Sequence, residues 1–279
     1  MRTYILVILV LLSFKTALGQ DNWTQKANFP CIGRAAAFSF SIGRKGYFGL
    51  GQDSTAIMKD LWEWDQLTNT WTQKASLPAL PRRVGVSFSI GTKGYICVGD
   101  DSLNHGSREV WEWDQNNNSW SKKADFPNDN AGLTVGFSIG SKGYIGTGTG
   151  SNINNSKEFW EYNPSSDTWT RKADFGGQAR YDAQGISIGD KGYIGGGWDD
   201  HGVYFSDFWE YDPNTDTWSK KADMPEYRSN SVGFSVCKKG YFMGGHCNDG
   251  TNFWYSNDLI EFDPLTDTWT QKTPLPSFP

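Results

Sequence analysis

The sequence predicts an all-β protein, a β-propeller in which each blade is a sheet of four short antiparallel strands. The first observation behind this prediction is an internal repeat, because the tripeptide Lys-Gly-Tyr recurs five times at steps of 48 or 49 residues. The second is composition: aromatic residues make up 15% of the chain, with 14 Trp but only 4 Met, which favours aromatic strands over helices. One such unit cannot bury both faces of its own sheet, so the units must stack around an axis. The five copies of the tripeptide lie at 45–47, 93–95, 142–144, 191–193 and 239–241.

Each unit is expected to contain four strands, as its third copy illustrates. A Gly-containing turn separates the first two strands, a variable polar loop separates the second from the third, and an Asn- or Asp-containing turn precedes the fourth. The third strand carries an acidic-aromatic element, Trp-Glu-Trp or Trp-Glu-Tyr in the first four units, and a further Trp follows in the fourth strand. In the third copy we expect strands at 135–139, 144–146, 159–162 and 168–170.

The repeat gives most of the conspicuous residues a structural interpretation. Twelve of the 14 Trp stand at repeat positions, so we expect them to form the core between blades and not ligand platforms. The recurring Glu of the acidic-aromatic element is expected to accept a structural hydrogen bond, because a reaction needs one such acid and not five. The Gly-Thr-Gly-Thr-Gly run at 146–150 lacks the helix and Lys-Ser/Thr pair of a phosphate loop, so we expect a strand end. The fourth-strand Trp expected to be buried between blades are Trp71, Trp120, Trp169 and Trp218.

The repeat resembles that of the kelch family. An aromatic residue precedes two glycines at 193–196 and 241–245, and a Tyr-Asp pair, a spaced Trp and a Pro-Arg stretch complete the pattern. The first three units lack the double glycine but keep the period. The resemblance implies a kelch β-propeller over 20–279, with five complete repeats plus one N-terminal strand at Trp23. Because kelch rings often join an N-terminal strand to C-terminal ones in a shared blade, we expect an incomplete six-bladed ring or a five-bladed ring with a redundant edge strand, and we favour the first.

The first 19 residues predict a secretory signal peptide. A basic Arg2, an apolar run at 4–12 and small residues at 17–19 form the three regions of such a signal. The apolar run is too short to cross about 30 Å of hydrocarbon, which disfavours a membrane anchor. We therefore expect cleavage near Gly19 and a secreted or periplasmic protein.

Composition and cysteine spacing disfavour several partners. The formal net charge of -5 provides no basic footprint for nucleic acid or for an anionic membrane surface. The four cysteines match no zinc-binding spacing, and we expect no metal and no cofactor. Cys237 and Cys247 should lie roughly 20 Å apart along a strand, which is too far for a disulfide. The remaining cysteines are Cys31 and Cys97.

The loops between second and third strands are the expected recognition surface. They share one face of the disc with the segments that lead into the first strands, and loops on a rigid scaffold carry recognition. An exposed aromatic beside carboxylates is suited to a sugar, although solvated polar loops are the alternative. The loops are 51–59, 99–108, 148–157, 197–206 and 245–257, and the ligand-binding candidates in them are Trp198, Trp254, Asp101, His105, Asp199, His201 and His246, with Asp100, Asp200 and Asp249 beside them.

A series of arginines forms a second set of candidates. Each one precedes an innermost strand, and the series is broken at Asn130. Side chains that point toward the axis would form a cationic ring suited to bidentate capture of a carboxylate. Alternatively, each pairs with a carboxylate of a neighbouring blade. These residues are Arg34, Arg82, Arg180 and Arg228.

Two classes of function follow from these features. We expect a secreted, non-enzymatic module that binds a glycan or an extracellular protein through its variable loops, although the fold alone does not establish this. The alternative is a carbohydrate-active enzyme, because kelch propellers also carry galactose-oxidase-like copper sites and a sialic acid mutarotase. The copper site needs ligands from a further domain, so the mutarotase-like alternative is the better one. Its candidate acid is Glu226, beside Arg228.

Overall fold

A computed structural model describes residues 23–103, 105–128, 132–149, 155–248 and 252–276. The expected signal peptide at 1–19, Asn130 and Asp249 lie outside the described residues. Within the described ranges, no helix has the length and apolar character needed to cross a bilayer.

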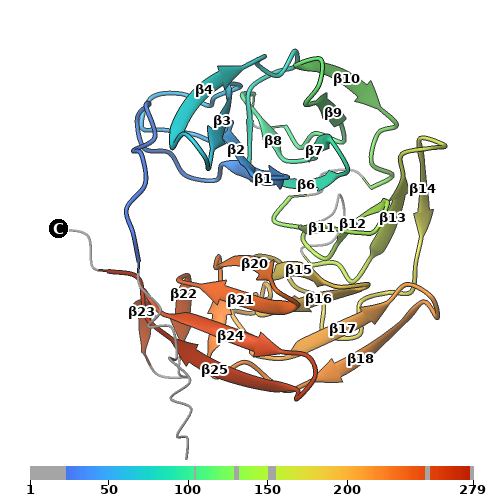
Figure 1. Ribbon diagram of the computed structural model, residues 1–279. Helices are drawn as coiled ribbons and strands as arrows, with labels where there is room; N and C mark the ends of the chain where they lie inside the picture. Colours follow the sequence, from blue (N-terminus) through green and yellow to red (C-terminus); the bar gives the residue numbers. More distant parts are fainter. Residues whose placement is uncertain (1–22, 104, 129–131, 150–154, 249–251, 277–279) are drawn as a thin grey trace, which may run out of the picture.

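Five four-stranded antiparallel sheets stand around a common axis as the blades of a propeller (Figure 1). In every blade the first strand lies innermost and the fourth outermost. The blades are β1 (Phe38–Ile42), β2 (Lys45–Gly49), β3 (Leu61–Asp65) and β4 (Thr70–Lys74); β6 (Val86–Ile90), β7 (Lys93–Cys97), β9 (Val110–Asp114) and β10 (Ser119–Lys123); β11 (Val135–Ile139), β12 (Lys142–Gly146), β13 (Phe159–Asn163) and β14 (Thr168–Arg171); β15 (Gln184–Ile188), β16 (Lys191–Gly195), β17 (Phe208–Asp212) and β18 (Thr217–Lys221); and β20 (Val232–Val236), β21 (Lys239–Met243), β24 (Leu259–Asp263) and β25 (Thr268–Lys272). The predicted fold class and the four strands per repeat are confirmed.

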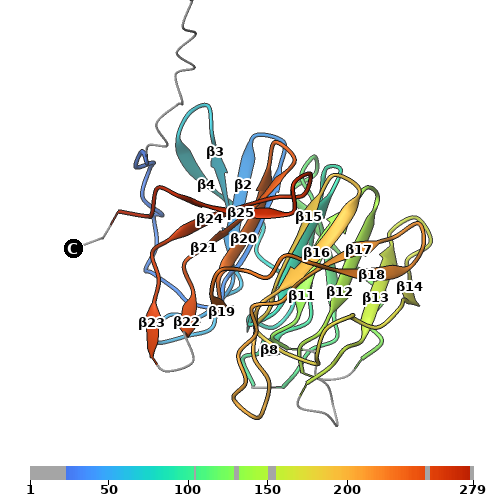
Figure 2. The ribbon, with the colours of Figure 1, turned by 90° about the horizontal axis from the view of Figure 1, so that it is seen from below.

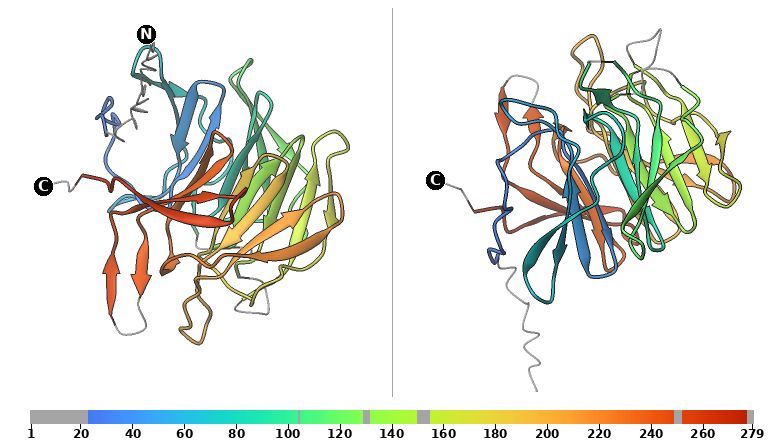
Figure 3. Two further views of the ribbon diagram at one scale, coloured as in Figure 1. Left: turned by 60° about the horizontal axis from the view of Figure 1, so that its bottom comes forward. Right: turned by 90° about the horizontal axis from the view of Figure 1, so that it is seen from above.

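Shorter strands lie on one face of the disc. They pair the segment that leads into a blade with the variable loop of that blade, so both lie on one face, as the sequence predicted. The β22–β23 hairpin and the loop at 197–206 project from this face in two different views (Figures 2 and 3). We call it the loop face. Its strands are β5 (Arg82–Arg83) with β8 (Asp100–Asp101), and β19 (Tyr227–Ser229) with β22 (His246–Asn248) and β23 (Phe253–Tyr255).

Neighbouring blades interlock through an apolar side chain of one inner strand and a glycine of the next blade's second strand. A Cβ added to Gly94 would collide with the ring of Phe40, and a Cβ on Gly240 would lie 2.6 Å from Cδ1 of Ile186. The Lys-Gly-Tyr glycine is therefore required by a close approach between sheets. The other two such pairs are Phe88 with Gly143 and Phe137 with Gly192.

The third strand supplies the buried aromatic of each interface. Trp113 is 0% exposed and its ring centroid lies 4.7 Å from that of Tyr47 in the preceding blade. The fourth-strand Trp, in contrast, are half-buried, so the prediction that they are buried between blades is corrected. Their indoles lie at the rim, where Nε1 of Trp120, for example, donates to the carbonyl oxygen of Ala75 in the preceding blade at 2.7 Å. They pack against the edge of the core, as Trp218 does on Phe159 of the preceding blade at 5.0 Å between ring centroids, and they link adjacent blades through this hydrogen bond.

The segment at Trp23 takes the place of an outer strand, but among the described residues no third strand lies beside it to pair with. It is extended and is not part of a sheet, whereas the sequence predicted a strand. Trp71 Nε1 donates to the carbonyl oxygen of Ala27 at 3.1 Å, which is the same hydrogen bond that the later blades use. The ring itself is open between the first and fifth blades (Figure 1).

Candidate functional site

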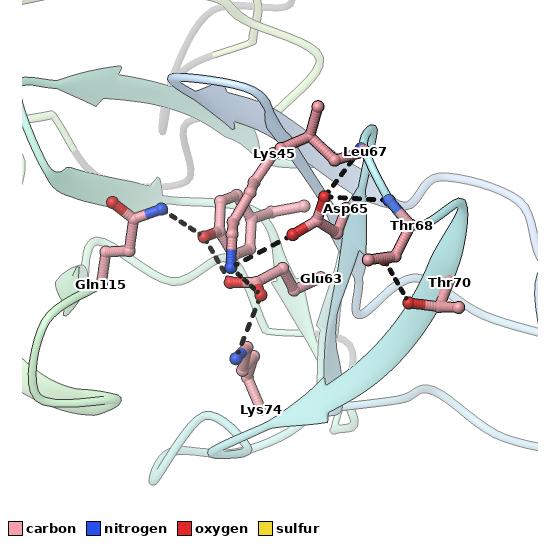
Figure 4. Close-up of polar contacts among 9 residues, drawn as sticks. Lys45, Glu63, Asp65, Leu67, Thr68, Thr70, Lys74 and Gln115 are labelled. Carbon is pink, nitrogen blue, oxygen red and sulfur yellow. Dashed lines mark hydrogen bonds and ion pairs between the residues drawn. The ribbon is translucent and has the colours of Figure 1, made fainter.

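The recurring Glu of the third strand is structural, as predicted. In the first blade Glu63 accepts hydrogen bonds from the Tyr47 hydroxyl and the Lys45 ammonium, each at 2.6 Å, and Lys74 lies 3.2 Å away (Figure 4). Gln115 of the second blade donates to the Tyr47 hydroxyl at 2.7 Å. Burial alone would raise the pKa of Glu63, but the hydrogen bonds from Lys45 and Tyr47 lower it below the usual range. The counterparts that accept from a tyrosine are Glu112, Glu161, Glu210 and Glu261.

The four candidate arginines are buried in ion pairs. Arg180 is 0% exposed, and its guanidinium donates to both carboxylate oxygens of Asp207 and to the carbonyl oxygen of Gly196. Each carboxylate precedes the third strand of the arginine's own blade, not of a neighbouring blade. The cationic ring considered from the sequence is therefore not formed by these side chains, which instead tie the variable loop to the segment that leads into the blade. The other pairs are Arg34 with Asp60, Arg82 with Glu109 and Arg228 with Asp258.

Small and polar residues of the inner strands line the axial channel. Its loop-face end is a cavity of about 280 Å³, and the lining residues include Ser39, Ser87, Thr134 and Gln184. No charged side chain lines it among the residues that the structure describes. Glu226, the acid of the enzymatic alternative, lies 3.6 Å from Arg228, which is already held by Asp258.

A row of aromatic rings crosses the loop face from the fourth blade to the fifth. Trp198 stacks on Tyr204 at 5.6 Å between centroids, and Tyr204 meets Phe253 edge-on at 5.3 Å. His246 lies 6.0 Å from Phe253 and stacks on Tyr255 at 4.7 Å. Tyr255 is 85% exposed and Phe253 58%, so one end of the row presents bare rings to solvent. We call these five residues the aromatic row.

The inner end of the aromatic row is anchored at the mouth of the channel. Trp198 Nε1 donates to Asp182 at 2.9 Å, and Tyr181 meets the Trp198 ring edge-on at 4.7 Å. Burial raises the pKa of Asp182, against the hydrogen bonds from Trp198 and Asn230. Trp198 is thus held in place by Asp182 and Tyr181 and supports the other rings of the row. The exposed rings of the row, Phe253 and Tyr255, are the ones available to a ligand.

The structure brings together only part of the predicted candidates. Trp198 and His246 belong to the aromatic row, whereas Trp254 pairs across the β22–β23 hairpin with the buried Cys247. His201 is exposed and lies 3.7 Å from Asp200. Asp199 accepts backbone hydrogen bonds within its own loop, from His201 and Val203.

The remaining loop candidates lie on the second blade. Asp101 accepts the backbone N–H groups of Leu103 and His105, and it lines a hollow of about 360 Å³ with Arg82, Glu109 and Trp111. Burial would raise the pKa of Glu109, but hydrogen bonds from Trp111 and Arg82 lower it to about 2. Glu109 is therefore the ionised partner of Arg82 at neutral pH, not a proton donor.

The thiols and the acidic groups give no metal centre in the part of the chain that the structure describes. No three His, Cys, Asp or Glu side chains there converge as metal ligands would. All four cysteines are free, and Cys97 and Cys247 are buried. Burial raises the pKa of the Cys247 thiol to about 11, so it is protonated at neutral pH.

Sequence reasoning missed Tyr204, Phe253 and Tyr255. The signal available was the Phe-Trp-Tyr run at 253–255, which is aromatic in an otherwise polar loop and has no counterpart in the other four units. Among the aromatic residues of these loops, only Trp198 and Trp254 were predicted as candidates, because they are the two Trp that stand outside the repeat positions.

Comparison with known proteins agrees with this architecture. A family model described as the KLHDC2/KLHL20/DRC7 kelch-repeats domain matches residues 84–279. The solved structure of YjhT is similar over 88% of this chain and 85% of that one, with a TM-score of 0.74 and 18% sequence identity, a likeness that concerns the fold alone. No curated protein sequence matches the chain.

Proposed function

The chain belongs to the kelch-repeat family, and from this premise we propose that it is a secreted binding module that recognises a glycan through its loop face. The observation that carries the proposal is the aromatic row, whose outer rings, Phe253 and Tyr255, stand exposed on the β22–β23 hairpin of the fifth blade. Exposed aromatic faces beside hydrogen-bonding groups suit the apolar face and hydroxyls of a sugar ring. The Tyr255 hydroxyl, the His246 ring and the carboxylates of the neighbouring loop supply such groups.

The scaffold supports a binding site that is formed before the ligand arrives. The Arg228–Asp258 and Arg180–Asp207 pairs hold the loops of the two blades that carry the row. Because the rings also stack on one another, little side-chain entropy remains to be lost when a ligand settles on them. Secretion is part of this proposal and rests on the sequence at 1–19.

The proposal is tested on residues 20–279 by a glycan array, followed by calorimetry with the best ligand. Tyr255→Ala and Phe253→Ala should each weaken binding by about 1–3 kcal/mol while leaving the melting temperature nearly unchanged, because both side chains are exposed. Leu265→Ala is the matched control, since Leu265 is 92% exposed in the β24–β25 turn, outside the loop face. Wild-type affinity in both aromatic variants, or the absence of any bound glycan, contradicts the proposal.

Two further measurements test secretion and the enzymatic alternative, which a binding assay does not test. N-terminal sequencing of protein secreted with its own leader should read from Gln20. Incubation of free sugars with the purified chain should leave them unchanged, and a catalysed conversion that Glu226→Gln abolishes would favour the enzymatic alternative instead.

A further inference from the structure

The axial cavity and the aromatic row begin at the same walls. The residue before Trp198, the innermost ring of the row, is Gly197, and a Cβ added to it would lie 3.0 Å from the Cα of Ala183, which lines the cavity. The residue before the histidine of the row is Gly245, and a Cβ there would lie 3.0 Å from the Cα of Ser231, another lining residue. Both loops that carry the row therefore leave the fold at the rim of the cavity.

The row runs outward from this rim. Its successive ring centroids lie between 4.7 and 6.0 Å apart, from Trp198 to Tyr255. The exposed end is on the β22–β23 hairpin, which projects from the loop face (Figures 2 and 3). A row of five rings is longer than one sugar, so a glycan that reaches from the cavity to the exposed rings is a chain of several units.

The cavity is suited to an uncharged sugar. No charged side chain lines it among the residues that the structure describes. A carboxylate that leaves water without a partner pays a large desolvation cost. The arginines of the two blades that carry the row do not offset it, because Arg180 is already paired with Asp207 and Arg228 with Asp258. An acidic terminal sugar is therefore disfavoured.

The cavity also presents free hydrogen-bonding groups. The Gln184 amide and the Ser39 hydroxyl both line it, and neither side chain forms a hydrogen bond with a residue that the structure describes. Amides and hydroxyls donate as well as accept, as the hydroxyls of a sugar do. The volume of about 280 Å³ lies at the lower end of ligand pockets, which fits one sugar ring. Away from the loop face the channel continues as a hollow of about 160 Å³.

We propose that the loop face binds a linear, uncharged oligosaccharide end-on. Its terminal sugar enters the axial cavity and meets Gln184 and Ser39, and the sugars that follow lie along the aromatic row as far as Tyr255. The proposal rests on the glycan-binding function above and adds the class of glycan. An internal sugar does not fit in the cavity in the same way, because the chain would have to continue from it into the smaller hollow beyond.

The end-on mode is tested by calorimetry with residues 20–279 and the best glycan of the array, used as a free oligosaccharide. The ligand is compared with forms that carry a bulky cap at the reducing end, at the non-reducing end or at both. Capping of at least one end should weaken binding by about tenfold or more, because the terminal sugar is then kept out of the cavity and loses its hydrogen bonds. Equal affinity for all four forms overturns the proposal.

The uncharged character is tested with the same ligand after oxidation of the terminal hydroxymethyl group to a carboxylate, at the end whose cap is harmful. The acid should bind about tenfold more weakly or worse, since the cavity has no cation to receive it. Equal or tighter binding of the acid overturns the proposal.

Variants of the cavity separate this proposal from the function on which it rests. Ser39→Leu, which fills the cavity from an exposed position of β1, and Gln184→Ala should each weaken binding of the uncapped glycan by about threefold or more. Neither should change binding of the doubly capped form. Ser235→Leu is the matched control, because Ser235 is an exposed inner-strand serine that lines only the hollow away from the loop face.

The outcomes are distinguishable. If Tyr255→Ala weakens binding while Ser39→Leu and Gln184→Ala both keep wild-type affinity, the glycan lies on the row alone, and the end-on mode is overturned although the proposed function stands. If no glycan binds, both are overturned.

Discussion

The four closed blade interfaces and the open one are built from the same repeat positions but bury them differently. Trp113 is fully buried against Tyr47. Trp64, at the same position of the first blade, is half-buried and lines a groove of about 390 Å³ between the first and fifth blades. The side chains are identical, so the difference comes from the neighbouring sheet alone. In a propeller the stabilising contribution of a repeat residue belongs to the interface and not to the blade that carries it.

The largest expected contrast is between Trp113→Ala and Trp64→Ala in the chain 20–279. Trp113→Ala should cost about 3–5 kcal/mol, because it empties a filled interface. Trp64→Ala should cost less than about 2 kcal/mol, because much of that ring already faces water. Urea denaturation of both variants measures the difference. Equal losses would mean that the groove is filled in solution.

The strands of this repeat could be predicted closely from the sequence because the same pattern of residues occurs in five copies. In the third copy the expected strands at 135–139, 159–162 and 168–170 differ from the observed ones by at most one residue at an end. The second strand begins two residues earlier than expected, at Lys142, because Gly140 adopts a positive φ of 58° and closes a two-residue hairpin turn.

The candidate site was less predictable, because it depends on pairs of residues from different parts of the chain. The spacing of Arg180 revealed a repeated position but not its partner Asp207, which lies 27 residues later. Likewise, Tyr204 and Phe253 come from different blades and stand outside the repeat positions, so no recurring pattern predicts their contact. Side chains that occur once, in loops, are positioned by the tertiary fold and leave no periodic signal.

A smaller contrast between the interfaces is expected at high pH. The Tyr193 hydroxyl donates to Glu210 inside a closed interface, and the Tyr241 hydroxyl donates to Glu261 beside the groove. Burial, and then the bond to the carboxylate, raises the pKa of Tyr193 well above its usual value, but that of Tyr241 only to about 12. A raised folded pKa means that the stabilisation is complete below pH 10 and is lost as the pH rises beyond it.

The free energy of unfolding should therefore fall by about 1.4 kcal/mol per pH unit above pH 10 for each tyrosine that stays protonated in the fold. Tyr193→Phe should remove one such contribution over the whole alkaline range, and Tyr241→Phe only up to about pH 12. Absorbance at 295 nm should show the Tyr241 hydroxyl ionising before that of Tyr193 in the folded chain. The reverse order would indicate that the fifth blade is covered.

The smallest contrast is a change of one methyl group to a hydroxyl at the first position of an inner strand. Val86 is 7% exposed and packs beside the Cα of Gly136, so the hydroxyl of Val86→Thr enters an apolar contact and should cost about 1–3 kcal/mol if it finds no partner. Val232 is 54% exposed at the groove, and Val232→Thr should change the free energy of unfolding by less than about 0.5 kcal/mol, because water solvates the new hydroxyl. The two substitutions are isosteric and lie at one repeat position, so strand propensity and side-chain volume cancel between them. Urea denaturation of the two variants measures the contrast, and a cost of Val232→Thr equal to that of Val86→Thr would show that β20 is covered in solution.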